Sequence, residues 1–297
     1  MSALGPTLFI IYINTLPREV NKQFVLFADD TNVIIKEKSL QSFESSINNT
    51  VDEMGVWFKC NGLLLNESKT KLLHFKTRTN NEIKLTNCNI DETDNHKFLG
   101  VIIDNNLSWK SHIQSLANKI NSCRFAFKIL SDHVSFDTCK IVYYAYVESL
   151  LRYGIAVWGS SSDFNRLFIA QKSIVRTICK APFRASCRPL FKKINLLTLP
   201  SLYILEVLKL IYKYPKCFES FIFNHSYNTR NKNMFSLPSH KLTMYEKSPI
   251  YMGMQLFNKL PYSYRALNEA QFSNCIKEKL IEKSYYNVKE MLEDTDF

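Results

Sequence analysis

The sequence lacks paired cysteines, internal repeats and any strong compositional bias. Its 297 residues are 46% hydrophobic and 22% charged, which excludes collagen-like, low-complexity and disordered chains. None of the eight cysteines forms a CxxC pair, and none combines with the six histidines at zinc-finger spacing. We therefore expect reduced cysteines and an intracellular protein, with no choice between nucleus and cytoplasm.

Signals for secretion or membrane insertion are also lacking. The opening stretch MSALGPTLFIIYINTLP is apolar, but it has no basic segment before the apolar run and no small-x-small cleavage site. The longest apolar stretch, near residue 150, is interrupted by Glu148 and Arg152. We expect neither a signal peptide nor a transmembrane helix, and no membrane partner.

Acidic residues are missing from one long stretch. Between Asp163 and Glu206 there is no aspartate or glutamate, although the formal net charge of the whole chain is +11. The cations of this stretch are Arg166, Lys172, Arg176, Lys180, Arg184, Arg188, Lys192 and Lys193. An excess of positive charge favours a polyanionic partner, either nucleic acid or a membrane surface, and says nothing about fold.

The pattern of apolar residues predicts an α+β protein that becomes helical after about residue 105. Spacings of three and four predict helices at residues 6–14, 40–61, from 109 to about 130, 137–153, 163–180 and 202–214, and a charged helix at the end. Runs rich in Val, Ile and Phe predict a hairpin of residues 23–28 and 31–36, then short strands at 71–76, 83–85 and 98–103. We expect these strands to be antiparallel.

Two adjacent carboxylates stand at the tip of the predicted hairpin, in the stretch FVLFADDTNVIIK. Asp29 and Asp30 repel each other if a tight turn holds them close together and partly desolvated, so a cation between them stabilises the arrangement. Mg²⁺ suits such a place because it binds few carboxylates together with water and phosphates. Aspartate is also an ordinary turn residue, so the pair alone does not distinguish a metal site from a plain turn.

The order of several motifs decides between these readings. The motifs are LGPTLFIIYINTLP at residues 4–17, FADD at 27–30, LLLNESKTKLLHF at 63–75, FLGVIID at 98–104, YVESLLRYGIAVWG at 146–159 and RPLFKKINLLTLPSLYILE at 188–206. In this order they resemble motifs B, C, D and E and the following helical region of reverse transcriptases of non-LTR, LINE-type, jockey-like retrotransposons. The resemblance covers nearly the whole chain. Each motif is weak alone, but their order and spacing together are specific.

The resemblance implies a domain organisation and a reaction. Residues 1–105 would be the C-terminal half of a polymerase palm, residues 106–187 a basic helical thumb, and residues 188–297 a C-terminal region of helices and loops. The family synthesises DNA on an RNA template by nucleotidyl transfer at two metal ions, Mg²⁺ or Mn²⁺. RNA template and DNA primer would be the partners.

The resemblance also assigns roles to single residues. Asp29 would bind metal with Asp30 as its partner, Phe27 would back the hairpin, and Gly5 and Pro6 would belong to the wall that faces template and nucleotide. Lys69 would lie near the triphosphate and stabilise or protonate the leaving pyrophosphate. Phe98, Leu99 and Gly100 would form the primer grip, and Lys172, Arg176 and Lys180 would meet the nucleic-acid backbone from one helix face.

Several of these residues also have a purely structural explanation. Lys69 is equally well a solvated loop lysine, Phe98 and Leu99 are partly strand core, and a basic helix face is often only solvated. A further set of aromatic residues could stack on bases, but we favour the protein core for it. These are Tyr143, Tyr144, Tyr146, Tyr153 and Trp158.

The resemblance begins inside motif B. Motif A, with another catalytic aspartate, and the fingers have no counterpart in the 297 residues. Met1 stands where the glycine before Ser2 is expected, and Thr15 replaces an aspartate. We expect these residues to bind metal weakly and to be unable to polymerise alone, with a separate chain that supplies the missing parts as a further partner. The alternatives are a non-catalytic nucleic-acid-binding protein derived from a retroelement and a decaying reading frame.

Overall fold

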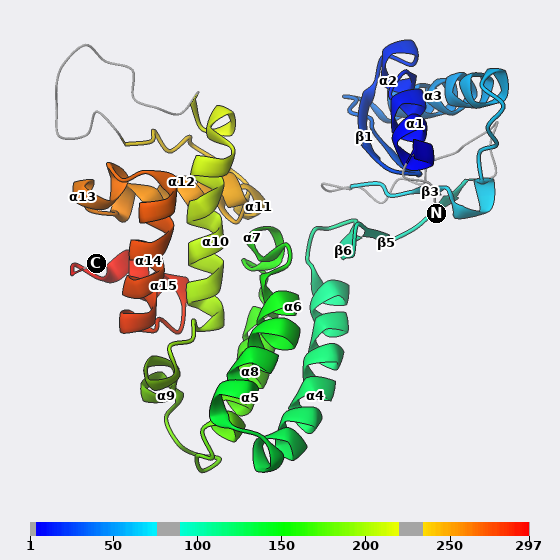
Figure 1. The fold of residues 1–297 in the computed structure, drawn as a ribbon. Coiled ribbons are helices and arrows are strands. Elements are labelled where there is room, and N and C mark those ends of the chain that lie inside the picture. Colours follow the sequence, from blue (N-terminus) through cyan, green and yellow to red (C-terminus); the bar gives the residue numbers. More distant parts are fainter. Residues whose placement is uncertain (1–3, 76–89, 220–233, 297) are drawn as a thin grey trace, which may run out of the picture. The chain divides into compact units, whose positions relative to one another are not determined.

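A computed structural model describes residues 4–75, 90–219 and 234–296, and it combines helices with short strands (Figure 1). The α+β class is therefore confirmed. The chain forms two compact units. Unit 1 comprises Met1–His96 and Asp104–Leu107, and unit 2 comprises Lys97–Ile103 and Ser108–Phe297.

Unit 1 packs one hairpin against three helices. These elements are α1 (Leu4–Ile13), α2 (Leu16–Glu19), β1 (Gln23–Phe27), β2 (Asp30–Ile34) and α3 (Leu40–Cys60). The core holds Ile13, Leu16, Val20, Met54, Trp57 and Phe58, and the partly buried Phe24, Leu26 and Val33 of the hairpin pack against it. The apolar residues whose spacing predicted the hairpin and the long helix are thus the residues that pack in this core.

Helix α3 begins and ends where the sequence predicts. The side chain of Ser39 caps it by accepting a hydrogen bond from the backbone N–H of Ser42, at 3.2 Å. Gly62 follows the helix with a φ of +64°, a left-handed conformation that glycine adopts without steric cost.

The small strands of unit 1 differ from the prediction. Strand β3 (Lys71–Leu72) pairs in parallel with β4 (Asp91–Glu92), so the expectation that all strands are antiparallel is wrong. The Lys71 ammonium group lies 2.6 Å from the Asp91 carboxylate across this pair, which is a long-range contact that no local pattern reveals. The predicted strand at 83–85 lies outside the described residues.

The predicted single strand at residues 98–103 is a hairpin. It consists of β5 (Asn95–Phe98) and β6 (Val101–Asp104), which form a two-stranded sheet. Leu99 has a φ of +44° and Gly100 a φ of +89°, so the chain reverses between them and cannot continue as a strand. The sequence pattern did not indicate this turn, because valine and isoleucine follow it directly and extend the apolar run.

Unit 2 is built almost entirely from helices. They are α4 (Lys110–His133), α5 (Phe136–Val142), a π-helical segment (Tyr143–Glu148), α6 (Ser149–Arg152), α7 (Ile155–Trp158), α8 (Phe164–Ile178), α9 (Cys187–Ile194), α10 (Leu199–Lys213), a 3₁₀ turn (Pro215–Cys217), α11 (Thr243–Glu246), α12 (Pro249–Lys259), α13 (Tyr262–Arg265), α14 (Glu269–Lys283) and α15 (Val288–Glu293). Helix α10 is the most buried, and it contacts α6, α7, α8, α12 and α14.

Among the described helices, no single one is long and apolar enough to cross a bilayer. The pair α9 and α10 passes that test together, with a bend of 54° between them. Ten residues of α10 are buried inside unit 2, as expected for a core helix.

Candidate metal-binding hairpin and nucleic-acid interface

The β1–β2 hairpin turns tightly at the carboxylate pair. Phe27 stands opposite Asp30 in the antiparallel register, which leaves Ala28 and Asp29 as a two-residue turn. Ala28 has a φ of +51°, a conformation that costs a residue with a side chain about 1–3 kcal/mol. The paired strands on both sides hold this strained turn in place, so the position of Asp29 is well defined.

The hairpin has a core face and an open face. Phe24, Leu26 and Val33 point to the core, whereas Val25 and Phe27 lie on the opposite face and are exposed. Asp30 shares the open face with its cross-strand neighbour Phe27, whose side chain is 61% exposed. Phe27 therefore does not pack beneath the hairpin, as a backing residue would.

Asp29 and Asp30 are both exposed, so the turn does not desolvate the carboxylate pair. Neither carboxylate forms an ion pair with another residue in the described parts of the chain. Within those parts, no three His, Cys, Asp or Glu side chains come together at a metal-binding distance. The pair is free to ligate Mg²⁺ together with water and phosphate oxygens, but as a partial site.

Lys69 is presented by a turn that Asn66 organises. The side-chain oxygen of Asn66 accepts hydrogen bonds from the Lys69 N–H at 3.2 Å and the Ser68 hydroxyl at 2.7 Å. The Thr70 hydroxyl donates to the Asn66 carbonyl at 2.9 Å. Lys69 itself ends the 3₁₀ turn Glu67–Lys69 and is exposed. Asn66 belongs to the motif that suggested Lys69, and it was not singled out from the sequence.

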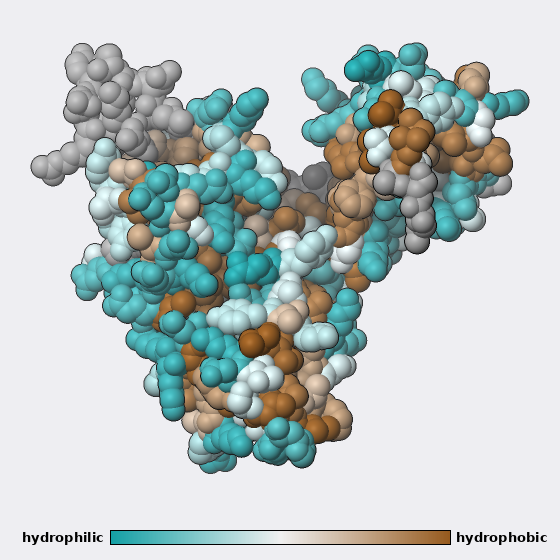
Figure 2. Space-filling view, in the orientation of Figure 1, coloured by the Kyte–Doolittle hydropathy of each residue, from teal (hydrophilic) through white to brown (hydrophobic). Residues whose placement is uncertain are grey.

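Gly5 and Pro6 lie in the first turn of α1, as the position of Pro6 predicts. A side chain at Gly5 would meet no atom within 4 Å, so this part of the helix faces open space. Figure 2 shows apolar side chains gathered over α1, where Leu4, Leu8 and Ile11 are exposed. The role of Gly5 and Pro6 as a wall beside template and nucleotide stays a prediction.

The turn between β5 and β6 is held by residues far along the chain. The Tyr153 hydroxyl donates a hydrogen bond to the Leu99 carbonyl at 2.5 Å. A Cβ on Gly100 would lie 3.4 Å from the Tyr153 ring, and a Cβ on Gly154 would lie 3.3 Å from Val101. The sequence favoured the protein core for Tyr153, which is wrong, because its side chain is 55% exposed. The structure instead makes Tyr153 the anchor of this turn.

Replacing Tyr153 with phenylalanine is expected to loosen the β5–β6 turn without unfolding unit 2. The substitution removes one hydrogen bond and keeps the ring against Gly100, so the expected cost is about 1 kcal/mol. Amide hydrogen exchange should become faster at residues 97–103. Tyr146, which is exposed and has no side-chain hydrogen bond in the described residues, provides the control Tyr146→Phe. Equal exchange in both variants would contradict the anchoring role.

His112 of α4 also holds β6 in place. This side chain is buried at the start of α4, and its Nδ1 accepts a hydrogen bond from the Ile102 N–H at 3.3 Å. Burial, with a smaller contribution from Lys119, lowers the pKa of His112. The Nε2 atom is buried without a hydrogen-bond partner in the described residues. His112 is therefore a neutral structural histidine.

Acidification is expected to destabilise unit 2 through His112. Because its pKa is lower in the folded state than the value of about 6.5 in the unfolded state, the unfolded chain takes up the proton first as the pH falls. The stability that depends on a neutral His112 is therefore present above pH 6.5 and is lost as the pH drops below this value. Urea titrations between pH 7.5 and 5 should show this loss in the native protein, a smaller one in His112→Leu, and an unchanged one in the exposed-site control His133→Gln.

The three cations predicted to share one helix face do not form a free basic face. Lys172 lies 4.5 Å from the centre of the Phe168 ring, and the Arg176 Nε donates to the Ala185 carbonyl at 2.9 Å. Lys180 lies beyond α8, because the helix ends at Ile178 and Lys180 has a φ of +49°. The shared helix face is thus wrong for Lys180, while binding of nucleic acid by these residues stays a prediction.

Comparisons with known proteins match this arrangement of motifs. Residues 2–103 match the family model described as reverse transcriptase (RNA-dependent DNA polymerase). Over 197 residues the chain is 28% identical to "RNA-directed DNA polymerase from mobile element jockey" of Drosophila melanogaster, which covers 61% of this chain and 22% of that protein. A protein of the same species, "Probable RNA-directed DNA polymerase from transposon BS", is 23% identical over 214 residues, 66% of this chain and 24% of that protein.

Residues 2–103 are thus similar to reverse transcriptases, and most of the chain is similar to polymerases named for jockey and another Drosophila mobile element. The chain spans about a fifth to a quarter of the length of these curated relatives. No solved structure matches it. The family match of the reverse transcriptase ends at Ile103, within β6, so it includes Asp29, Asp30, Lys69 and the β5–β6 turn.

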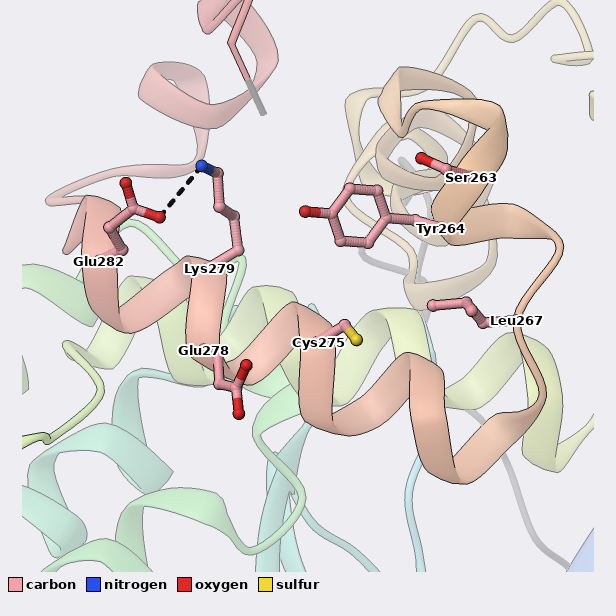
Figure 3. A pocket seen from close by; sticks show the side chains of 7 residues that line it. All are labelled: Ser263, Tyr264, Leu267, Cys275, Glu278, Lys279 and Glu282. Carbon is pink, nitrogen blue, oxygen red and sulfur yellow. Dashed lines mark hydrogen bonds and ion pairs between the residues drawn. The ribbon is translucent and has the colours of Figure 1, made fainter.

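Unit 2 has a surface cavity lined by residues outside the matched range. It is formed between α13 and α14 and is lined by Ser263, Tyr264, Leu267, Cys275, Glu278, Lys279 and Glu282 (Figure 3). Lys279 is paired with Glu282 at 3.0 Å across one turn of α14. This wall is an ordinary solvated helix face, and the cavity holds none of the residues that the resemblance assigns.

Proposed function

We propose that unit 1 is the C-terminal half of a polymerase palm and that unit 2 is a thumb with the downstream region of a reverse transcriptase. The β1–β2 hairpin carries this proposal, because its two-residue turn presents two exposed carboxylates that form no ion pair within the described residues. They stand in the FADD stretch, which resembles the family's metal-binding box. Asp29 and Asp30 would hold the divalent ion, Mg²⁺ or Mn²⁺. When bound, it would stabilise the charge that develops on the attacking and leaving oxygens.

The carboxylate pair needs a further ligand. Asp29 belongs to the turn and Asp30 to the first position of β2, and successive side chains of a strand point to opposite faces. Two such carboxylates do not surround two ions on their own. A third carboxylate would therefore have to join them, and a strand paired with the free edge of β1 or β2 would present it on the open face that Asp30 shares.

The remaining residues support positioning of substrates. Lys69, held by the Asn66 turn, is exposed and supplies a positive charge for a triphosphate. Tyr153 fixes the Leu99–Gly100 turn, and Gly100 is exposed and has no side chain, so its backbone would approach a sugar-phosphate chain on the side away from the Tyr153 ring. RNA template and DNA primer are the partners that this arrangement fits.

Binding to a primer–template tests the proposal. The purified 297-residue protein should bind a fluorescent DNA primer annealed to RNA, and the logarithm of its affinity should fall linearly with the logarithm of the salt concentration. The same measurement with a neutral dextran of similar size is the control. Affinity for the primer–template that is absent, or that does not change with salt, would contradict the proposed function.

A further inference from the structure

One aromatic side chain of unit 2 stands almost fully in solvent. Phe183, in the connection between α8 and α9, is 82% exposed. Figure 1 shows this connection at the end of unit 2 where α4 passes into α5. A buried phenylalanine typically stabilises a protein by about 1.5–3 kcal/mol, and Phe183 forgoes most of this stabilisation. Single exposed apolar side chains are common, so the case for a role depends on what surrounds Phe183.

The backbone that carries Phe183 is fixed. The Ala185 N–H donates to the Pro182 carbonyl at 2.9 Å, which closes a β-turn with Phe183 and Arg184 at its two central positions. The Arg176 Nε donates to the Ala185 carbonyl at 2.9 Å and braces the turn from α8. Ring and guanidinium are therefore presented by a hydrogen-bonded corner, which lowers the entropic cost of binding a ligand there.

Cations predominate around the corner. Arg184 is exposed, and no described residue forms an ion pair or hydrogen bond with its side chain. Lys180, three positions before Phe183, is 69% exposed at its side chain, and Asp132 at 3.9 Å is a weak, exposed partner. From residue 164 to 205 the sequence has no carboxylate.

We propose that Phe183 stacks on an unpaired base of single-stranded nucleic acid, with Lys180 and Arg184 contacting the phosphates on either side. Aromatic faces interleaved with cations are the means by which proteins bind single strands without sequence preference. This site rests on the proposed function, since it adds a single-strand contact to a protein that binds a primer–template.

Fluorescence of a single introduced tryptophan tests the contact. The three native tryptophans, Trp57, Trp109 and Trp158, are buried, so the variant Phe183→Trp adds an exposed fluorophore. An oligothymidylate of about 12 nucleotides should quench this emission and protect it from acrylamide. Tyr262→Trp is the control, because Tyr262 is 62% exposed in the same unit but lies in α13, at the end opposite the connection between α8 and α9 (Figure 1). Its emission should not respond.

Affinity measurements give the second readout. Phe183→Ala is expected to weaken binding of the oligothymidylate by about 5- to 100-fold, Phe183→Tyr to retain it, and Tyr262→Ala to leave it unchanged. Affinity for a blunt DNA duplex, which offers no unpaired base, should be the same in all four proteins.

Three results would overturn the inference. They are equal affinity of native protein and Phe183→Ala for the oligothymidylate, an equal loss for oligothymidylate and duplex, and quenching of Phe183→Trp by polyglutamate instead of the oligonucleotide. In each case the native protein still binds its primer–template, so the proposed function stands. If the native protein binds no nucleic acid at all, the proposed function fails together with the inference.

Discussion

Replacing Gln171 with leucine is expected to lower the free energy of unfolding of unit 2 by about 3–5 kcal/mol. Gln171 is 1% exposed, and its amide Nε2 donates to the Tyr143 hydroxyl at 2.7 Å and to the Leu197 carbonyl at 3.0 Å. Its Oε1 accepts from the Leu199 N–H at 2.8 Å. Leucine fills similar space but leaves all three buried polar groups without a partner.

A urea titration followed by the emission of the buried Trp158 measures this loss. Gln114→Leu is the matched control, because the Gln114 side chain bonds Asn118 and Arg166 on the exposed face of α4. Its effect should stay within about 0.5 kcal/mol. A similar midpoint for Gln171→Leu and the native protein would show that the buried amide does not join the π-helical segment to α10.

Replacing Gly159 with alanine is expected to cost about 3 kcal/mol in the same titration. A Cβ at this position would lie 2.3 Å from Cδ2 of Tyr203 and 2.6 Å from the Ile155 carbonyl oxygen. Tyr203 is fully buried on α10 and the carbonyl belongs to the backbone, so neither atom can move aside cheaply. The whole contact between α7 and α10 has to shift to accept the methyl group.

Gly253 offers a control of the same kind within unit 2. It lies in α12, and an added Cβ would meet Phe218 at 3.5 Å, an ordinary van der Waals distance. Since alanine favours a helix over glycine by about 1 kcal/mol, Gly253→Ala should leave the stability unchanged or raise it slightly. Equal losses in the two variants would argue against the tight packing at Gly159.

Local patterns in the sequence predicted the parts of the fold that depend on local physics. The spacing of apolar residues predicted α3 and α4, and the strand composition on both sides of Asp29 and Asp30 predicted their hairpin. In the structure a two-residue turn carries Asp29 next to Asp30 at the tip of this hairpin, where the sequence predicted the carboxylate pair.

Features that depend on distant residues were not predictable. The hydrogen bond from Tyr153 to Leu99 joins residues 54 positions apart, and the parallel pairing of Lys71 with Asp91 spans 20. The prediction of a basic helix face was wrong for Lys180, because the spacing of apolar residues does not show that α8 ends at Ile178. The exposure of Phe183 also depends on tertiary structure, because the sequence around an apolar residue next to a proline does not show whether that residue is buried or exposed.

Primer extension with simultaneous measurement of binding tests the account most directly. The 297-residue protein is mixed with a DNA primer on an RNA template, deoxynucleotides and Mg²⁺ or Mn²⁺. The account predicts salt-sensitive binding of the primer–template but no template-dependent incorporation, because Asp29 and Asp30 are only part of a metal site. Template-dependent incorporation that disappears in Asp29→Asn would contradict it, since the described residues would then suffice for catalysis.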